Sequence, residues 1–382
     1  MTKQLWIFGL AIGLSACGGG SGDASPSIGS KPLTSSEIKQ RVEQQEQTIR
    51  SQSLWFIDTG APIHATAAVA DNKVFIGNDE GNLFALATDT GEIIWQLAIG
   101  SNISGDIVAH NDSIIFLTEG AELIALNIHD GSDVWRLDTR AERILDTWDY
   151  HNNHPLIVNN ELYLVSKSGY VMAINPNTGE LLWEKNIGER LLGRPALYDN
   201  TLSFASETGL YNFDINRKEI NWYNDTTGYS SSPAVAEGVV ITGSRNAYAQ
   251  AVDLQTGENV WDVQHGGNWV TGEAIYHQGN FYIGTSDDHL LESINAKTGE
   301  VNWNIDAGGN VFARPVIYQD KVLITAGSAY VDQSKGYLTV VDFSGEVHWQ
   351  LEATNFLNTV TVEQGVIYTG NESGYFYALP LE

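Results

Sequence analysis

Short apolar runs recur along most of the chain, and turns rich in Gly, Asn and Asp separate them. Residues 67–95 show the pattern, with apolar runs at 67–70, 73–77, 83–86 and 92–95. Runs of this length joined by tight turns are typical of antiparallel strands. This stretch therefore predicts one sheet of four short antiparallel strands.

Tryptophan recurs at the end of each such unit, at intervals of 39 to 48 residues. A period near forty with four short strands is typical of a β-propeller, in which each repeat forms one blade. We interpret these tryptophans as packing residues of the core rather than as platforms for a ligand. They are Trp55, Trp95, Trp135, Trp183, Trp222, Trp261, Trp303 and Trp349.

The turn before most of these tryptophans also repeats. Glycine supplies the positive φ that a tight hairpin turn requires without steric strain. Lys218 occupies the corresponding position before Trp222, so we expect a different turn there. In the other units the residue four places ahead of tryptophan is Gly91, Gly131, Gly179, Gly257, Gly299 or Gly345.

The two ends of the repeat region complement one another. Residues 359–379 supply three strands without a closing tryptophan, and residues 53–56 supply a fourth strand alone. Pairing them would complete an eighth blade and remove an open sheet edge. The sequence thus predicts an all-β fold over residues 54–382: an eight-bladed β-propeller of four-stranded antiparallel blades, closed by its N- and C-terminal strands.

The N-terminal segment has the pattern of a targeting signal. Lys3 precedes an apolar run at 5–14, followed by Ser15-Ala16-Cys17. This is typical of a signal peptide over 1–16, and the run is short for a membrane span. We expect residues 17–53 to form a flexible tether, with a short exposed helix starting at a capping box near Thr34, that spaces the body from the membrane.

The sequence around Cys17 resembles the bacterial lipobox. That resemblance implies that Cys17 is the lipidated first residue of the mature protein, and Gly18 in place of Asp implies sorting to the outer membrane. An ordinary cleaved signal with a chance cysteine is the alternative.

Composition narrows the function. The 382 residues include 20 Lys and Arg against 47 Asp and Glu, a formal charge of −27, which argues against binding nucleic acid. One cysteine excludes a disulfide framework and a Cys-rich metal site. Motifs for a nucleophile elbow, a zinc protease or a phosphate loop are missing. We therefore expect no catalytic residue, cofactor or metal.

One loop has some metal-ligand character, since it holds Asp146, Asp149, His151 and His154 together. A loop that packs on the rim of the propeller explains the same residues. We prefer that explanation.

Alignment of the repeats gives one position at the start of each inner strand. Because inner strands line the axis of a propeller, these residues should ring one mouth of its central channel. The large polar members are His154, Arg194 and Arg314, and we expect them either to pair with carboxylates or to meet an anionic ligand. The eight residues are Thr66, Gly105, His154, Arg194, Ser232, Gly272, Arg314 and Thr359.

Residues 85–95, 173–183 and 251–261 resemble the PQQ-type propeller repeat of quinoproteins. The resemblance implies that the tryptophans dock between adjacent blades. Quinoprotein enzymes of this type hold their cofactor with calcium, a catalytic Asp and often a vicinal Cys pair, under long loops. This chain has Cys17 alone and only two modest insertions, at 139–154 and 326–336, so a PQQ-dependent dehydrogenase is a minor alternative.

The lipobox, acidic body and lack of catalytic motifs together resemble the BamB family of outer-membrane protein assembly factors. The resemblance implies a non-enzymatic scaffold, lipid-anchored on the periplasmic face of the outer membrane of a Gram-negative bacterium. Its partners would be the barrel-inserting subunit of the assembly machinery and unfolded outer-membrane proteins.

The family's main contact is a Leu-x-Leu-Arg pattern in the loop that opens the fourth blade. The matching residues here are Ile187-Gly188-Glu189-Arg190, so Arg190 is kept and Ile187 replaces the first Leu. The resemblance makes these two the candidate partner-binding residues, beside His154, Arg194 and Arg314. An envelope lipoprotein that binds another protein, peptide or saccharide at its channel mouth is the alternative function.

Overall fold

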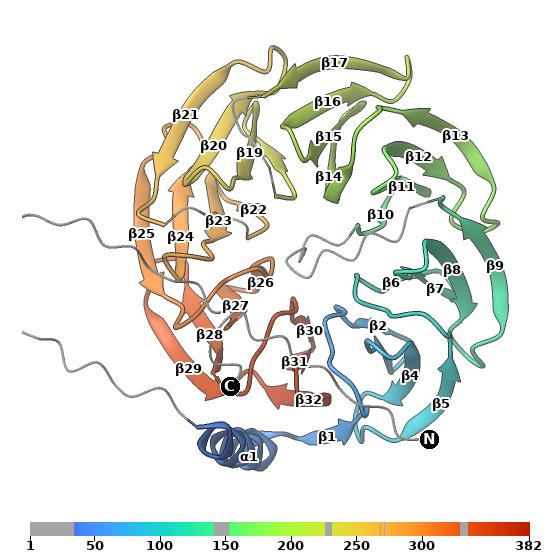
Figure 1. The fold of residues 1–382 in the computed structure, drawn as a ribbon, viewed down its shortest axis with the longest axis vertical. Coiled ribbons are helices and arrows are strands. Elements are labelled where there is room, and N and C mark those ends of the chain that lie inside the picture. The colour runs from blue at the N-terminus through green and yellow to red at the C-terminus, as the bar shows by residue number, and fades with distance from the viewer. Residues whose placement is uncertain (1–33, 141–152, 226–230, 268, 271, 329–334) are drawn as a thin grey trace, which may run out of the picture.

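The computed structural model describes residues 34–140, 153–225, 231–267, 269–270, 272–328 and 335–382. Eight four-stranded antiparallel sheets stand in a closed ring, each with its first strand nearest the axis (Figure 1). The predicted eight-bladed propeller is thus confirmed. The expected signal peptide, Cys17 and the first part of the expected tether, residues 17–33, lie outside the described residues.

The blades follow the chain in order. From the axis outward, blades 1 to 4 consist of β2 (Ala68–Ala70), β3 (Lys73–Gly77), β4 (Asn82–Ala87) and β5 (Ile93–Ala98); β6 (Val108–His110), β7 (Ser113–Leu117), β8 (Glu122–Asn127) and β9 (Asp133–Asp138); β10 (Leu156–Val158), β11 (Glu161–Val165), β12 (Tyr170–Ile174) and β13 (Leu181–Asn186); and β14 (Leu191–Tyr198), β15 (Thr201–Ser206), β16 (Leu210–Asp214) and β17 (Glu219–Asn224).

Blades 5 to 8 consist of β18 (Ala234–Ala236), β19 (Val239–Gly243), β20 (Tyr248–Asp253) and β21 (Asn259–Gln264); β22 (Ile275–His277), β23 (Asn280–Gly284), β24 (Leu290–Asn295) and β25 (Val301–Asp306); β26 (Val316–Tyr318), β27 (Lys321–Gly327), β28 (Gly336–Asp342) and β29 (Val347–Ala353); and β30 (Thr361–Glu363), β31 (Val366–Gly370), β32 (Tyr375–Pro380) and β1 (Trp55–Asp58).

The eighth blade closes the ring as the sequence predicts. Strand β1 pairs antiparallel with β32, with Trp55 opposite Ala378 and Asp58 opposite Tyr375. The outermost strand of this blade therefore comes from one end of the chain and its three inner strands from the other.

The alternation of strand direction gives the ring two distinct faces. The turns that join the first strand to the second, and the third to the fourth, lie on one face, which we call the turn face. The turns between second and third strands and the connections between blades lie on the other, which we call the connector face. Residues at the start of each inner strand follow a connection, so they approach the axis from the connector face.

The tryptophans dock each blade on the next. The indole Nε1 of Trp55 donates a hydrogen bond to Thr88 O in blade 1 at 2.9 Å. A Cβ placed on Gly91 of the same turn would lie 2.5 Å from the Trp55 ring, so a side chain there would displace the indole. Equivalent indole bonds, 2.9–3.3 Å long, are made by Trp95, Trp135, Trp222, Trp261, Trp303 and Trp349.

The junction between blades 3 and 4 departs from this pattern. Lys218 takes the place of glycine with φ of +59°, and its N–H bonds Asp214 O at 2.8 Å, as that of Gly91 bonds Ala87 O. The expectation of a different turn is therefore wrong, because lysine adopts the left-handed conformation itself. The difference at this junction lies in Trp183. Its indole N–H donates to no backbone carbonyl of the next blade among the described residues. Its ring stacks on Phe213 at 5.8 Å, with the Lys218 ammonium also 5.8 Å away.

A helix precedes the propeller. Helix α1 (Ser35–Gln52) begins at the expected capping box, in which Thr34 and Glu37 bond each other's backbone. The helix lies against β29 and β32 outside the ring (Figure 1), so it is docked rather than an exposed spacer. No described helix is long and apolar enough to cross a membrane.

Polar groups that the hydrophobic pattern does not reveal explain the docking of α1. Glu46 is 4% exposed and accepts hydrogen bonds from Thr354, Asn371 and Tyr377. Burial and the adjacent carboxylate of Glu46 raise the pKa of Tyr377, which keeps the phenol protonated as a donor. The buried Ile49 supplies the apolar anchor.

A histidine joins the first and last blades on the connector face. His64 follows β1, and its Nδ1 lies 2.9 Å from Asp79 of blade 1 while its Nε2 contacts Glu372 of blade 8. Burial alone would lower the pKa of His64, but the hydrogen bonds and charges of the two carboxylates raise it to about 10. The imidazolium therefore clamps the closing seam.

This clamp makes stability depend on pH. Because the folded pKa is raised, its contribution should be complete below pH 6.5 and should disappear as the pH rises to about 10. We expect His64→Gln to lower the free energy of unfolding by about 3 kcal/mol at pH 6 and by much less at pH 10, measured by urea unfolding. The exposed His348→Gln is the control. A His64→Gln deficit that is the same at both pH values would contradict the clamp.

Candidate functional site

Five charged side chains from five blades meet near the axis on the connector face, and we call them the axial cluster. Each stands at or just before the inner strand of its blade. Blades 2 and 6 lie opposite each other in a ring of eight. Their carboxylates, Asp106 and Glu273, nevertheless reach the same basic side chains. The members are Asp106, His154, Arg194, Glu273 and Arg314.

Arg194 and His154 bridge the two carboxylates. Arg194 Nη2 contacts Asp106 Oδ2, and its Nε lies 3.9 Å from Glu273 Oε2. His154 Nδ1 lies 3.2 Å from Asp106 Oδ1, and its Nε2 lies 3.7 Å from Glu273 Oε1. These contacts link blades 2, 3, 4 and 6 across the axis.

Hydrogen bonds between neighbouring blades hold the start of the inner strands in place. The backbone N–H of Arg194 bonds Ser232 Oγ of blade 5 at 2.9 Å, and that of Arg314 bonds Thr359 Oγ1 of blade 8 at 3.1 Å. At these two ring positions the backbone thus binds the side chain at the next ring position. This fixes where the long arginine side chains begin.

The two carboxylates and Arg194 are ionised. Burial would raise the pKa of Asp106, but Arg194 and His154 hold it well below its usual range. Burial opposes ionisation of Glu273 too, yet His154 and Arg194 lower its pKa. Burial disfavours the charge on Arg194, and the two carboxylates raise its pKa nonetheless. Opposite charges therefore outweigh desolvation in this part of the axis.

Arg314 differs from Arg194. Its guanidinium has no hydrogen-bond or ion-pair partner among the described residues, although it is only partly exposed. The nearby charge of Arg194 and burial together lower the pKa of Arg314, and they outweigh the attraction of Asp106 and Glu273. Arg314 is thus the one cluster member whose side chain makes no hydrogen bond or ion pair within the described structure.

The sequence anticipated part of this site. It placed His154, Arg194 and Arg314 at one mouth of the ring, and the structure brings all three together. It missed Asp106 and Glu273, which directly follow the ring positions Gly105 and Gly272. The available signal was an acidic residue after each of the two ring glycines. Pairing with carboxylates, one of the two expectations, applies to Arg194 but not to Arg314.

The loop with some metal-ligand character is only partly within the described residues. His154 belongs to the axial cluster, whereas Asp146, Asp149 and His151 lie outside the described residues. Within the described ranges, no group of three or more His, Cys, Asp or Glu side chains could hold a metal ion.

The other candidate residues lie on blade 4. Ile187 packs partly buried against the core between blades 3 and 4, so most of its surface is already used. Arg190 is largely buried, and its Nη1 bonds Glu207 Oε1 at 2.9 Å. Between them, Glu189 accepts hydrogen bonds from Thr208 and Tyr211. This connection is therefore held firmly against the turn between β15 and β16.

Exposed groups surround that connection, and we call them the blade 4 rim. Gly188, Glu207 and Thr208 are exposed, and Tyr223 is 42% exposed. The Tyr223 hydroxyl donates to Thr208 Oγ1 at 2.8 Å, and its ring lies 4.6 Å from that of Tyr211. The rim thus presents a fixed aromatic ring beside a carboxylate.

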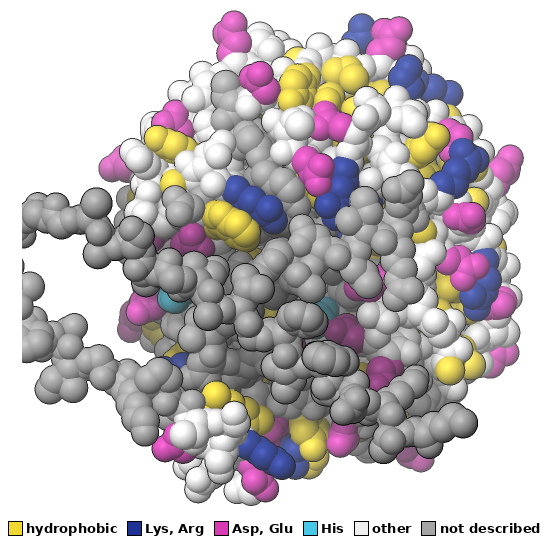
Figure 2. All heavy atoms as spheres, viewed as in Figure 1, with side chains coloured by type: hydrophobic (Ala, Val, Ile, Leu, Met, Phe, Trp, Pro, Cys, Tyr) yellow, Lys and Arg dark blue, Asp and Glu magenta, His cyan; other side chains and the backbone are white. Residues whose placement is uncertain are grey.

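Over the face shown in Figure 2, acidic side chains are spread around the edge of the molecule.

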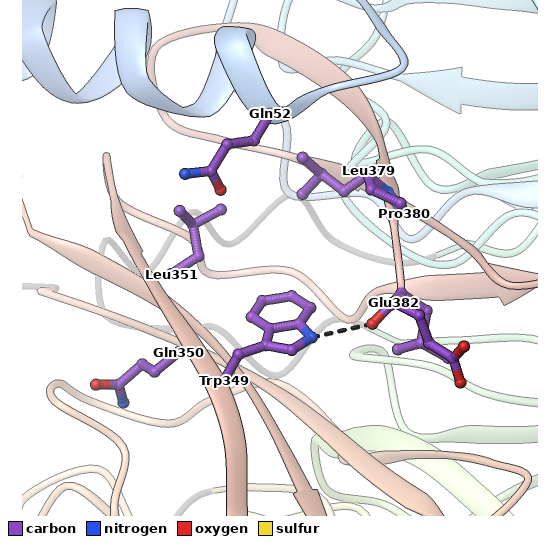
Figure 3. A pocket seen from close by; sticks show the side chains of 8 residues that line it. Gln52, Trp349, Gln350, Leu351, Leu379, Pro380 and Glu382 are labelled. Carbon is purple, nitrogen blue, oxygen red and sulfur yellow. Dashed lines mark hydrogen bonds between the residues drawn. The ribbon is translucent and has the colours of Figure 1, made fainter.

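A groove of about 260 Å³ lies between blades 7 and 8, beside the end of α1 (Figure 3). Trp349 donates its indole N–H to Leu381 O at 3.0 Å, and Gln52 of α1 and Leu351 line the same groove. In blade 8 no hairpin turn joins the third and fourth strands, because they come from opposite ends of the chain. The glycine turn that covers other tryptophans is therefore missing here, which explains the opening.

Known proteins resemble this chain over most of its length. The family model described as outer membrane protein assembly factor BamB matches residues 39–263 and 249–380. An outer membrane protein assembly factor BamB from Yersinia pestis is 20% identical over 371 residues, which cover 85% of this chain and 88% of the relative. The crystal structure of BamB from Moraxella catarrhalis has a TM-score of 0.59 at 21% identity, covering 75% of this chain and 85% of that one.

An enzyme also resembles the chain. A tetrathionate hydrolase from Acidithiobacillus ferrooxidans is 22% identical over 376 residues, covering 82% of this chain and 72% of the relative. The repeat therefore occurs in catalytic and non-catalytic proteins, and the fold alone does not separate them.

Removal of Arg194 should destabilise the axial cluster. We expect Arg194→Leu to leave Asp106 and Glu273 buried without their main counter-charge, which costs about 3–5 kcal/mol in urea unfolding at pH 8. The loss should be smaller at pH 4, where the carboxylates can take up protons. The exposed Arg217→Leu should change stability by less than about 0.5 kcal/mol. Equal effects of the two substitutions would show that the cluster adds nothing to stability.

Proposed function

The chain belongs to the outer membrane protein assembly factor BamB family, and we propose that it is a non-enzymatic scaffold of the outer-membrane assembly machinery. The observation that carries this proposal is the family match, which extends across nearly all of the propeller. It includes blade 4, where the connection with Arg190 lies. The barrel-inserting subunit is the proposed partner, and unfolded outer-membrane proteins are its proposed clients.

The blade 4 rim is the proposed contact surface. Interface energy concentrates in a few aromatic and arginine side chains held in place by their neighbours. Tyr223 fits that description, since it is exposed and fixed by Thr208 and Tyr211. Arg190 is held by Glu207 and shapes the connection from beneath. We propose that Tyr223 makes direct contact, while Arg190 acts mainly by positioning the loop.

A scaffold role also agrees with the chemistry of the axial cluster. Asp106, Glu273, Arg194 and His154 are engaged with one another. A catalytic acid or base needs a proton that it can exchange with a substrate, and the mutual pairing of these groups opposes that. The relative that hydrolyses tetrathionate makes direct assays of activity worthwhile, but no catalytic arrangement in the described ranges favours an enzyme.

We further propose that Cys17 carries the lipid anchor and that the propeller lies on the periplasmic side of the outer membrane. The sequence supports this through the apolar run at 5–14 and the small residues before Cys17. Two acyl signals or a lipid with additional contacts give stable anchoring. Contact with the assembly machinery would add to the lipid in holding the protein at the membrane.

Affinity purification tests the partner. The tagged full-length protein should recover the barrel-inserting subunit from detergent-solubilised outer membranes. We expect Tyr223→Ala and Arg190→Ala each to lower recovery about tenfold, because each removes an anchor or its support. Recovery would be measured by quantitative mass spectrometry.

Blade 4 offers matched controls on the turn face. Tyr198 is 43% exposed at the end of β14, and Arg217 is exposed in the turn before β17. Tyr198→Ala and Arg217→Ala should keep full recovery. If the unaltered protein recovers no barrel-inserting subunit, the proposed function fails. If all four variants behave alike, the contact lies elsewhere on the propeller.

Fractionation tests the anchor. Cys17→Ser should abolish labelling by radioactive palmitate and remove the protein from the outer-membrane band of a sucrose gradient. Gly18→Asp should keep the label but move the protein to the inner-membrane band, as the sorting pattern implies. Labelling that persists in Cys17→Ser would exclude Cys17 as the anchor.

A further inference from the structure

Arg314 carries a charge that the described structure does not pair. Arginine keeps its proton under all physiological conditions and offers five N–H donors in a planar fork. Its backbone is fixed by the bond to Thr359, but no described side chain accepts from its guanidinium. In a chain of charge −27 with 47 acidic residues, such an arginine is unusual.

The neighbouring groups show why no internal carboxylate serves Arg314. Asp106 contacts Arg194 and His154, and Glu273 is shared by Arg194, His154 and the Ser232 hydroxyl, which donates to it at 2.8 Å. Thr359 Oγ1 accepts the Arg314 N–H, and its own proton has no acceptor among the described residues. Two kinds of donor therefore remain available beside blades 7 and 8.

We propose that the connector-face mouth of the ring is a binding site for a single carboxylate, held by the Arg314 guanidinium and assisted by the Thr359 hydroxyl. A carboxylate presents two oxygens in a plane, which match the guanidinium fork in a bidentate pair. The group can belong to a free organic acid or to an acidic side chain of a polypeptide. Arg314 is partly exposed rather than fully buried.

The charge balance of the cluster sets the class of anion. Arg194 and His154 contact both carboxylates, so the Arg314 guanidinium is the charged group left to meet one further negative charge. A phosphate dianion or a polyanion would also meet repulsion from Asp106 and Glu273. The site should therefore prefer a monocarboxylate to phosphate at equal ionic strength.

Thermal unfolding of the full-length protein in detergent tests the site, with sodium acetate as the probe. We expect acetate to raise Tm by about 2 °C over sodium chloride at equal ionic strength, and phosphate to raise it less. Arg314→Gln should abolish the rise. Arg217→Gln is the matched control, because Arg217 is exposed on the turn face and pairs only locally with Asp214.

A second variant and a second measurement keep the test decisive if Arg314→Gln does not fold. Arg314→Lys keeps the charge but removes the planar fork, so it should retain at most about a third of the acetate effect. In the unaltered protein, the line width of carboxyl-labelled ¹³C-acetate should increase in NMR spectra, and Arg314→Lys should reduce that increase in proportion.

Peptide competition separates the two sources of the carboxylate. Displacement of labelled acetate by acetyl-Gly-Asp-Gly-amide, but not by its Asn counterpart, supports a polypeptide side chain. Acetate binding without displacement supports a small organic acid. Equal Tm in acetate and chloride with unchanged line width, or an acetate effect that survives in both Arg314 variants, would overturn the proposal. Partner recovery in the purification experiment is independent of these outcomes.

Discussion

The contact of each outer-strand tryptophan with the next blade is the interaction on which the ring depends. A four-stranded sheet is apolar on both faces in its middle strands, as the fully buried Val74, Phe75 and Ile76 show. Such a sheet becomes stable only when neighbours cover both faces. The indole of Trp55 fits against the bare backbone of Gly91 and bonds Thr88 O. One aromatic ring thus sets both the spacing and the register between adjacent sheets.

This packing also explains why the axis can hold charge. Backbone-to-side-chain bonds from Arg194 to Ser232 and from Arg314 to Thr359 fix the start of two inner strands. The positions of the axial side chains are therefore set by the ring rather than by their own attraction. Preorganised charges lose little entropy when they pair, and Asp106 can remain ionised although it is 6% exposed. The closed ring of blades thus brings the axial cluster together, and the cluster in turn links blades 2, 3, 4 and 6.

The repeat made the fold readable from the sequence, whereas interactions between distant polar residues did not follow from it. Of the four strands expected over 67–95, β3 has the expected bounds, while β5 runs to Ala98. Periodicity records which residues face a neighbouring blade, so it finds strands and blade number. It does not record that Glu46 would meet Tyr377, more than three hundred residues away, or that Asp106 would lie beside Arg194. Docking of α1 and the acidic half of the axial cluster were missed for that reason. The turn at Lys218 was also predicted wrongly from the sequence. The strain of a positive φ is modest enough for lysine to take the place of glycine there.

The exceptional junction and the proposed contact surface both involve blade 4, at its two ends: the Lys218 turn lies on the turn face and the blade 4 rim on the connector face. Between blades 3 and 4, Lys218 stands where six other blades have glycine, and Trp183 lacks the indole bond that the other seven tryptophans make within the described structure. That junction is held instead by the stacking of Trp183 on Phe213 and by Ile187. Aromatic and aliphatic packing tolerates small rotations that a directional hydrogen bond resists. A ring fixed at seven junctions keeps its shape when the eighth adjusts. A small rotation of blade 4 at this junction would carry the blade 4 rim with it, so the proposed contact surface could fit a partner without opening the propeller.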